Sequence, residues 1–514
     1  MATFPLNSPT GRWIMVAAIL ASSMGFIDGT ALNVVLPSLQ KGLQATGADL
    51  FWILNAYLLM LASLILIGGS LGDRLGRKRV FMTGIAVFLI GSVACGCSPN
   101  TMLLILCRIV QGIGGALMIP GSLSLISAAI DEKEKGKAIG IWSAATTVVT
   151  VGGPILGGAL ADAGLWRYIF FINLPIGALS LLILWRKVGE SKDEGSSGGL
   201  DFAGSLAIAL GLALLTFGCL RIPAVGWRHW GTGGTMGAGL LLLIVFLVIE
   251  KRSRSPMMPL QLFANSSFSG ANALSFFLYA GLGAGMLFLS LNLVQIQGYS
   301  QLESGLTFLP FTLLMISLSR YAGELSDRWG ARPLLIAGPL AAGAGLLLLS
   351  FAGQTHGPGG YWANFFPGIL VLGLGMTFTV APLTATVMGS VDQRFSGVAS
   401  GVNNAMTRIA SVSANAVFGA LVVVFFSGAL EGQLSGTAAA VAISATEKQA
   451  VMAQAVNLGD ARVPAAVNDR DKPAVAAAYR NAFITAYSKI LRISAVLAWL
   501  GALMALVFVS SKHE

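Results

Sequence analysis

Charge is scarce in this sequence. Only 11% of its 514 residues are Asp, Glu, Lys or Arg, and 55% are hydrophobic, whereas an ordinary soluble domain carries about 25% charged residues. Apolar runs of about 20 residues, the length that crosses a bilayer as a helix, recur along the chain. Together these features exclude a large soluble enzyme and predict an all-α membrane protein that crosses the lipid bilayer many times.

Cysteine and histidine are also few, and neither type is clustered. The Cys95-Gly-Cys97 pair lacks the spacing of metal ligands, and the remaining cysteines and the three histidines are scattered: Cys107, Cys219, His229, His356 and His513. We find no Gly-x-x-x-x-Gly-Lys-Ser/Thr phosphate-binding loop. These absences argue against an enzyme and against an ATP-driven pump, and we expect no cofactor and no bound metal.

The formal charge of +10 does not indicate a nucleic-acid partner, because of where the basic residues lie. We expect fourteen membrane-spanning helices, near residues 13–35, 50–71, 80–98, 101–123, 136–161, 166–187, 201–220, 235–250, 268–296, 303–321, 332–352, 362–389, 397–427 and 483–510. Eighteen Lys and Arg residues then fall in the segments on the side of the termini, against four in the short loops opposite. The positive-inside rule therefore predicts that both termini are cytoplasmic, in a multi-pass inner-membrane protein.

The first apolar run carries Asp28 and continues to Pro37 without a cleavage site, so we expect no signal peptide.

Two internal repeats divide the chain into similar halves. The loop that contains Gly69, Asp73, Arg74, Gly76 and Arg77 recurs 254 residues later, where its first four named residues match Gly323, Asp327, Arg328 and Gly330, and residues 140–160 align with 401–421. Parallel repeats of this kind are typical of transporters whose site lies between the halves. We therefore predict a six-helix bundle at 1–189, a cytoplasmic linker at 190–200, an inserted two-helix hairpin at 201–254, and a second bundle at 255–514 that includes an outer segment at about 428–480.

Polar residues inside apolar helices are the candidate functional residues. Asp28 is the deepest carboxylate. Because a charge in a membrane helix is costly, we expect Asp28 to face the central cavity and to be functional. Arg108, which stays charged at physiological pH, shares a helix face with Gln111 at a spacing of three residues. Asp28 is a candidate partner for Arg108. The alternatives are a structural hydrogen bond for Asp28 and a packing seam for the Arg108 face.

A second polar stripe lies on the thirteenth predicted helix, where Asn404, Arg408, Ser411 and Asn415 share a face. Arg408 stands where the matching fifth helix has Thr147, so the halves differ chemically, and we expect a cavity or gate role. In the fifth helix, Gly153, Pro154, Gly157 and Gly158 indicate a bent helix with a face for close packing. The repeated loop is interpreted as a cytoplasmic latch that must open during transport, with a purely topogenic basic loop as the alternative.

Five segments resemble the major facilitator superfamily, specifically its fourteen-helix drug:proton antiporter branch. They are residues 27–37, 69–80, 106–112, 151–158 and 166–177. The resemblance implies a fold of two pseudo-symmetric six-helix bundles with an inserted two-helix hairpin. It also implies proton coupling at Asp28, charge balance at Arg108, gating by Asp73 and Arg74, and packing of Gly153-Pro154 against the other half.

We therefore expect a monomeric, proton-coupled exporter of small hydrophobic or cationic compounds, such as drugs and antibiotics. Candidate residues lining its cavity are Phe26, Asn33, Trp52, Asn55, Tyr57, Gln111, Phe277, Asn292, Asn404 and Arg408. The second half has no deep carboxylate, which weighs against dicationic substrates. Export of a lipid or a native metabolite, uptake by proton symport, and a membrane sensor that transports nothing stay open as alternatives.

Overall fold

The computed structural model describes residues 4–131, 134–191, 201–226, 229–253, 256, 258–355, 357–391, 396–435 and 444–510. The predicted linker, apart from Glu190 and Ser191, and part of the outer segment, residues 436–443, lie outside this range. Through the inserted hairpin the described chain forms α1 (Pro9–Leu43), α2 (Gly47–Leu75), α3 (Arg77–Gly96), α4 (Thr101–Ala129), α5 (Lys135–Asp162), α6 (Tyr168–Phe171), α7 (Asn173–Lys187), α8 (Phe202–Val225) and α9 (Trp230–Arg252).

The remaining chain is helical as well. It forms the short 3₁₀ helix η2 (Leu260–Ala264), then α10 (Ser266–Gln295), α11 (Gln301–Leu306), α12 (Leu309–Trp329), α13 (Ala331–Leu349), η3 (Pro358–Gly360), α14 (Tyr361–Asn364), α15 (Phe366–Gly389), α16 (Ser396–Ser435), α17 (Ala445–Ala453), η5 (Gln454–Asp460) and α18 (Lys472–Phe508). Outside these helices, the described residues include an isolated bridge between Phe4 and Ile130.

The prediction of an all-α membrane fold is confirmed. Within the described residues, thirteen helices are long and apolar enough to cross a membrane, and Val148–Asp162 of α5 is a shorter apolar stretch. The number fourteen stays a prediction. Two expected spans are each built from two helices, α6 with α7 and α11 with α12. Pro175 and Pro310 lie just after these breaks. The breaks occur there because proline cannot donate the backbone hydrogen bond that a continuous helix needs.

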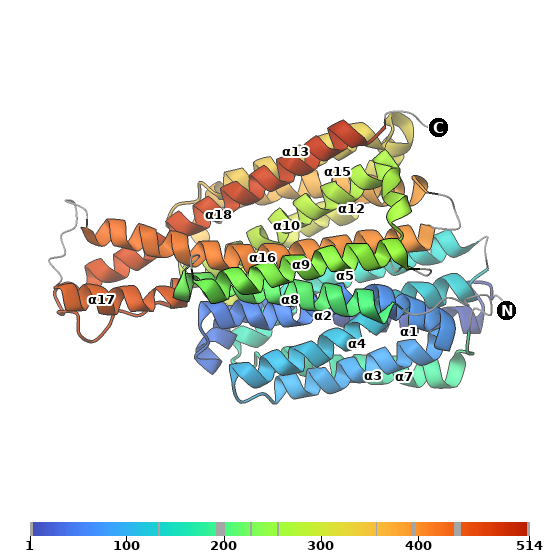
Figure 1. The fold of residues 1–514 in the computed structure, drawn as a ribbon, viewed down its shortest axis with the longest axis horizontal. Coiled ribbons are helices and arrows are strands. Elements are labelled where there is room, and N and C mark those ends of the chain that lie inside the picture. The colour runs from blue at the N-terminus through green and yellow to red at the C-terminus, as the bar shows by residue number, and fades with distance from the viewer. Residues whose placement is uncertain are drawn as a thin grey trace.

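The helices run nearly parallel to one long axis, in two groups that follow the order of the chain (Figure 1). The early helices α1 to α4 and α7 lie on one side, and α10, α12, α13, α15 and α18 lie on the other. Between them, α16 packs against α2 from the first group and against α10 and α18 from the second. The hairpin α8–α9 packs through α8 on α16 and α2, so it covers the α2–α16 boundary.

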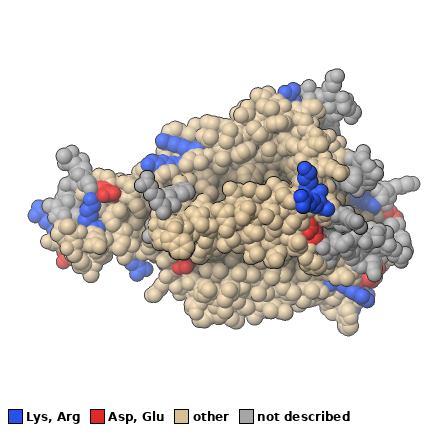
Figure 2. Space-filling model, in the orientation of Figure 1, with Lys and Arg blue, Asp and Glu red and all other residues tan. Residues whose placement is uncertain are grey.

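The two ends of the molecule differ. We call the end where α1 begins and α18 finishes the terminal end, and the opposite end, which carries α17, the distal end (Figure 1). Charged side chains gather toward these ends, whereas the middle of the face in Figure 2 is almost free of them. That distribution is expected of a protein whose middle lies in hydrocarbon.

Candidate functional site

A buried ion pair joins α1 to α4. The Arg108 Nη1 atom lies 2.6 Å from the Asp28 Oδ2 atom, and the two side chains are 1% and 2% exposed. The Arg108 Nε–H donates to the Ile53 carbonyl at 3.2 Å, and its guanidinium lies 4.4 Å above the centre of the Tyr57 ring. Thus Arg108, for which the sequence offered Asp28 as a candidate partner, pairs with that carboxylate and is held by groups from α1 and α2.

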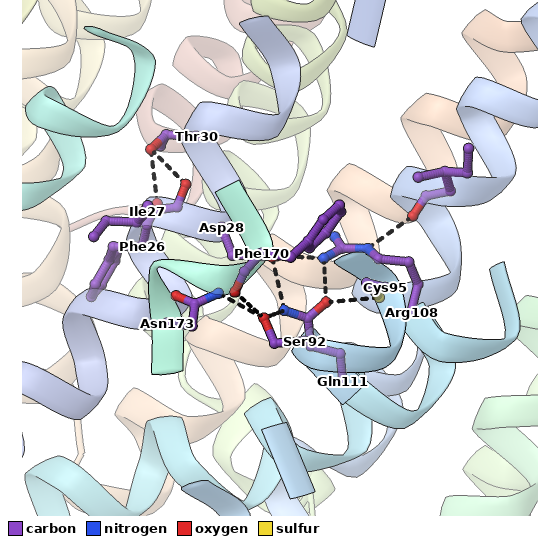
Figure 3. Close-up of polar contacts among 11 residues, drawn as sticks. Phe26, Ile27, Asp28, Thr30, Ser92, Cys95, Arg108, Gln111, Phe170 and Asn173 are labelled. Atoms are coloured by element: carbon purple, nitrogen blue, oxygen red, sulfur yellow. Dashed lines mark hydrogen bonds and ion pairs between the residues drawn. The ribbon is translucent and has the colours of Figure 1, made fainter. Parts of the chain in front are cut away.

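Gln111 extends the ion pair into a network (Figure 3). Its Nε2 donates to Asp28 Oδ1 at 2.9 Å, and its Oε1 accepts from Arg108 Nη1 at 2.8 Å. The network continues through Ser92 of α3, whose hydroxyl donates to the Phe170 carbonyl and accepts from Asn173 Nδ2 at 2.9 Å. Both oxygens of Asp28 are therefore hydrogen-bonded, and four segments of the first half meet at one polar centre.

Close helix packing makes this network possible. A Cβ atom added at Gly91 of α3 would lie 2.7 Å from the Gln111 backbone nitrogen, and one at Gly112 would lie 2.6 Å from the Tyr57 carbonyl oxygen. Glycine at these positions lets α2 and α3 approach α4 closely enough for short side chains to reach one another. Ser92 and Asn173 were missed as site residues. Their only sequence signal is a polar side chain within an apolar run.

The surroundings of Asp28 differ from the sequence expectation of a carboxylate that faces the central cavity. The structure places it inside the first-half bundle, paired and 2% exposed. The physical reason is the cost of burying a charge in an apolar environment, which falls when an opposite charge and hydrogen-bond donors are adjacent. In this conformation the Asp28 carboxylate lies within the first half and not at the boundary between the halves.

The glycines of α5 make two different contacts. Gly153 and Gly157 face Thr30 and Ala31 of α1, within the first half. Gly158 faces the backbone of Gln301 and Leu302 in α11, and Gly305 of α11 in turn faces the carbonyl of Pro154. The packing of this motif against the other half therefore runs through Pro154 and Gly158, while Gly153 packs on α1.

Hydrogen bonds between the halves gather at the distal end. The Asp162 carboxylate accepts from the backbone N–H groups of Gln301 and Leu302 at 2.8 and 2.9 Å. Gln301 also donates to the Ser38 hydroxyl, and Gln295 Nε2 donates to Gln40 Oε1 at 2.9 Å. The distal ends of the two halves are thus held together in this structure. Asp162 was missed because it follows the last apolar residue of α5 and reads as an ordinary helix end.

The distal segment after α16 adds to this closure. Gln40 of α1 donates to the Asn457 carbonyl at 3.2 Å, and Leu458 of η5, with a positive φ of 55°, packs near Gly47 of α2. The segment belongs to the second half in sequence. In space, η5 contacts α2 as well as α10, α16 and α18.

The predicted latch is only partly described. The side chains of Asp73, Arg74 and Asp327 lie outside the described residues. Gly69 lies near Pro120 of α4, and Gly76 has a φ of +110°, which glycine adopts readily. The Glu190 carboxylate accepts from the backbone N–H groups of Lys78 and Arg79 at 2.9 and 3.1 Å, and Arg77 N–H donates to the Ser191 carbonyl. Arg328 is exposed on the last turn of α12.

The candidate cavity residues do not form one cluster. Phe26 contacts Trp142 of α5, Trp52 contacts Phe217 of the inserted hairpin, and Phe277 contacts its neighbour Phe276. The other polar candidates are spread over both halves: Asn33, whose carbonyl accepts from Ser290; Asn292, buried beside Gln297; Asn404, bonded within its own helix; Asn55, fully buried on α2; and Arg408, partly exposed on α16.

Comparison with known proteins identifies the family. Residues 18–415 match the model of the Major Facilitator Superfamily. The chain is 34% identical over 422 residues to the multidrug resistance protein Stp of Mycobacterium tuberculosis, covering 82% of this chain and 77% of that protein. It is 31% identical to the methylenomycin A resistance protein of Bacillus subtilis (81% and 88% covered) and 30% identical to the tetracenomycin C resistance and export protein of Streptomyces glaucescens (82% and 78% covered).

Solved structures agree on the fold. A bacterial homologue of the human lysosomal transporter Spinster, in an inward-facing and unoccupied conformation, matches with a TM-score of 0.68 at 18% identity, with 99% of each chain covered. A transporter of the POT family matches with a TM-score of 0.66 at 13% identity, with 98% of each covered. The chain belongs to the Major Facilitator Superfamily and is a multi-pass membrane transporter, not an enzyme.

Proposed function

We propose that this transporter exports hydrophobic, drug-sized compounds across the inner membrane in exchange for protons, with its terminal end in the cytoplasm. Export of antibiotics is supported by three relatives at 30–34% identity that are named for drug resistance or export. The orientation is supported by the excess of Lys and Arg in the segments at the terminal end. In the conformation described above, closure at the distal end corresponds to an outer side that is shut.

The single observation that carries proton coupling is the Asp28–Arg108 pair. A carboxylate buried with an arginine can accept a proton only by losing the ion pair at 2.6 Å, because a neutral carboxyl group no longer balances the guanidinium. Protonation therefore loosens α1 from α4 and changes the packing energy of the first half. A ligand or a proton shifts a conformational equilibrium by its differential affinity for the two states. Both oxygens of Asp28 are hydrogen-bonded in the state described here, and a second state in which these bonds are broken would bind a proton with a different affinity.

This coupling acts through conformation instead of through direct competition. Asp28 is enclosed in the first half, so in this conformation a substrate between the halves and a proton on Asp28 occupy different sites. We propose that substrate binds to the state that is open at the terminal end, and that its binding stabilises the ionised form of Asp28 in that state. Proton uptake from the distal side then favours the return of the empty transporter.

The test is efflux from proteoliposomes driven by an imposed proton gradient. We expect Asp28→Asn to abolish gradient-driven accumulation while leaving the protein folded, since asparagine can keep hydrogen bonds to Gln111 and Arg108. Asp469→Asn is the control, because Asp469 lies on the exposed distal segment and pairs only locally with Lys472. Gradient-driven transport that survives unchanged in Asp28→Asn overturns proton coupling at this residue. Proton uptake on substrate addition in detergent, instead of release, would favour symport.

A further inference from the structure

The boundary between α2 and α16 contains buried polar atoms that have no partner. Asn55 of α2 is fully buried, and neither its Nδ2 nor its Oδ1 atom finds a hydrogen bond among the described residues. Asn415 of α16 is 6% exposed, and its Oδ1 atom also has none there. A buried polar atom without a partner costs about 1–3 kcal/mol. These atoms therefore need a partner that the described part of the chain does not supply in this state.

The two amides lie at one level of the boundary. Phe51 of α2 packs on Gly419 of α16, where an added Cβ atom would lie 2.9 Å from its ring. The two helices run in opposite directions, so one turn toward the terminal end leads from Phe51 to Asn55 and from Gly419 to Asn415. Asn55 comes from the first half and Asn415 from the second.

Arg408 lies on the same stripe, two turns or about 10 Å closer to the terminal end. It is partly exposed, and no carboxylate in the described chain forms an ion pair with it. Ser411 lies about one turn from Arg408 toward the distal end and faces Gly283 of α10. This stripe of α16 therefore lies against α10 as well as α2.

The charges of the region do not balance. The Asp28 carboxylate is already neutralised by Arg108 at 2.6 Å, which leaves Arg408, on a membrane-spanning helix, without an ion-pair partner among the described residues. An arginine there is costly unless it meets water, an anion or acceptor oxygens. The unpartnered amide atoms at one end are one donor, Asn55 Nδ2, and two acceptors, the Oδ1 atoms of Asn55 and Asn415. Together with the guanidinium donors at the other end, they suit a molecule that presents both carbonyl and hydroxyl groups over roughly the length of a drug.

We propose that Arg408, Asn55 and Asn415 form a substrate subsite that selects uncharged compounds carrying carbonyl and hydroxyl groups and rejects lipophilic cations. This inference rests on the proposed export function and narrows its substrate class. A monocation held about 6 Å from Arg408 at an effective dielectric constant of about 20 is repelled enough to weaken binding about a hundredfold. A carbonyl oxygen in the same place instead accepts hydrogen bonds from the guanidinium.

The experiment compares two coumarin dyes of matched size, one an uncharged ester and the other a quaternary ammonium analogue. Equilibrium binding is measured by fluorescence on the purified full-length protein, so the result does not depend on proton coupling. In the wild type we expect the ester to bind about a hundredfold more tightly than the ammonium dye. We expect Arg408→Gln to remove most of that preference and Arg408→Glu to reverse it.

Arg492→Glu is the matched control, because Arg492 is an exposed arginine that lies over Phe351 on the outside of the second half. It should keep the wild-type preference. Equal binding of both dyes by the wild type, no binding of either dye, or an unchanged preference in folded Arg408→Gln each overturns the subsite. The two proposals can be told apart in the Asp28→Asn variant. If this variant loses gradient-driven efflux but keeps the preference for the ester dye, the subsite is supported independently of proton coupling.

Discussion

The polar groups of the first half and those of the α2–α16 boundary are in opposite situations. Around Asp28 both carboxylate oxygens, the Arg108 guanidinium and both amide atoms of Gln111 have hydrogen-bond partners, and the Asn173 Oδ1 atom and the Tyr57 hydroxyl at the edge of this centre have none among the described residues. Along the boundary, Asn55 and Asn415 keep unpartnered atoms and Arg408 has no described acid. Satisfied buried networks rigidify a structure, whereas unsatisfied ones are costly. The first half is thus built to hold its own shape, and the boundary is built to meet something that comes and goes.

The largest expected effect comes from removing each of the two arginines, Arg108 and Arg408, in turn. Arg108→Ala leaves Asp28 buried without its cation, and breaking a buried pair in this way costs about 3–5 kcal/mol. Arg408→Ala removes a partly exposed cation with no described acid, so we expect little change in stability. Thermal unfolding of the purified variants in detergent measures both. Similar losses of melting temperature in the two variants would contradict the distinction.

The double variant Asp28→Asn with Arg108→Gln sharpens the result. Replacing both members of a buried pair by neutral groups of similar shape is far less costly than removing one. We therefore expect the double variant to be clearly more stable than Arg108→Ala. If it is equally unstable, the stability depends on the volume of Arg108 and not on its charge.

The second test concerns the contact between the halves at the distal end. Gly158→Val introduces a side chain where the α11 backbone lies, and overpacking of this kind costs about 1–3 kcal/mol. We expect the distal ends to separate in a larger fraction of molecules. Spin labels at Lys41→Cys and Gly353→Cys, in a Cys97→Ser background, report the distance between the halves by pulsed electron paramagnetic resonance.

Gly152→Val is its control within the same helix. An added Cβ at Gly152 meets nothing within 4 Å, so this variant changes helix composition without touching α11. We expect its distance distribution to match the parent protein. A shift of the same size in both variants would mean that flexibility of α5, not its contact with α11, sets the closure.

The sequence predicted the helices, because apolar runs are local features of the chain, and it named Asp28, Arg108 and Gln111, which meet at the polar centre. The domain bounds stay a prediction. It could not predict that Asp28 would be enclosed, since that depends on Gly91 and Gly112 allowing α2 and α3 to approach α4. It also missed Asp162 and Glu190. Each is an ordinary charged residue next to an apolar run, and its role arises from a backbone segment that is distant in sequence.

The smallest expected effect lies at the terminal end, where the two copies of the repeated loop differ. In the first half, α3 begins after Gly76 with its first N–H groups bonded to Glu190 and Ser191. In the second half, α13 begins after Gly330 without a side-chain cap. A carboxylate at a helix N-terminus stabilises it by about 0.3–1 kcal/mol, so amide hydrogens at the start of α3 should exchange more slowly than those at the start of α13.

Glu190→Gln breaks this asymmetry without altering the apolar core. An amide oxygen still accepts hydrogen bonds, but it lacks the charge that favours the helix N-terminus and pairs with Arg79 at 3.6 Å. We expect exchange at residues 78–81 to quicken about two- to fivefold, the rate change that corresponds to that energy, and exchange at 332–335 to stay the same. Hydrogen–deuterium exchange with mass spectrometry resolves both segments. Slower exchange at the start of α13 than at the start of α3 in the wild type would contradict this prediction. It would show that the contacts of Glu190 do not make the first copy of the loop the more firmly held of the two.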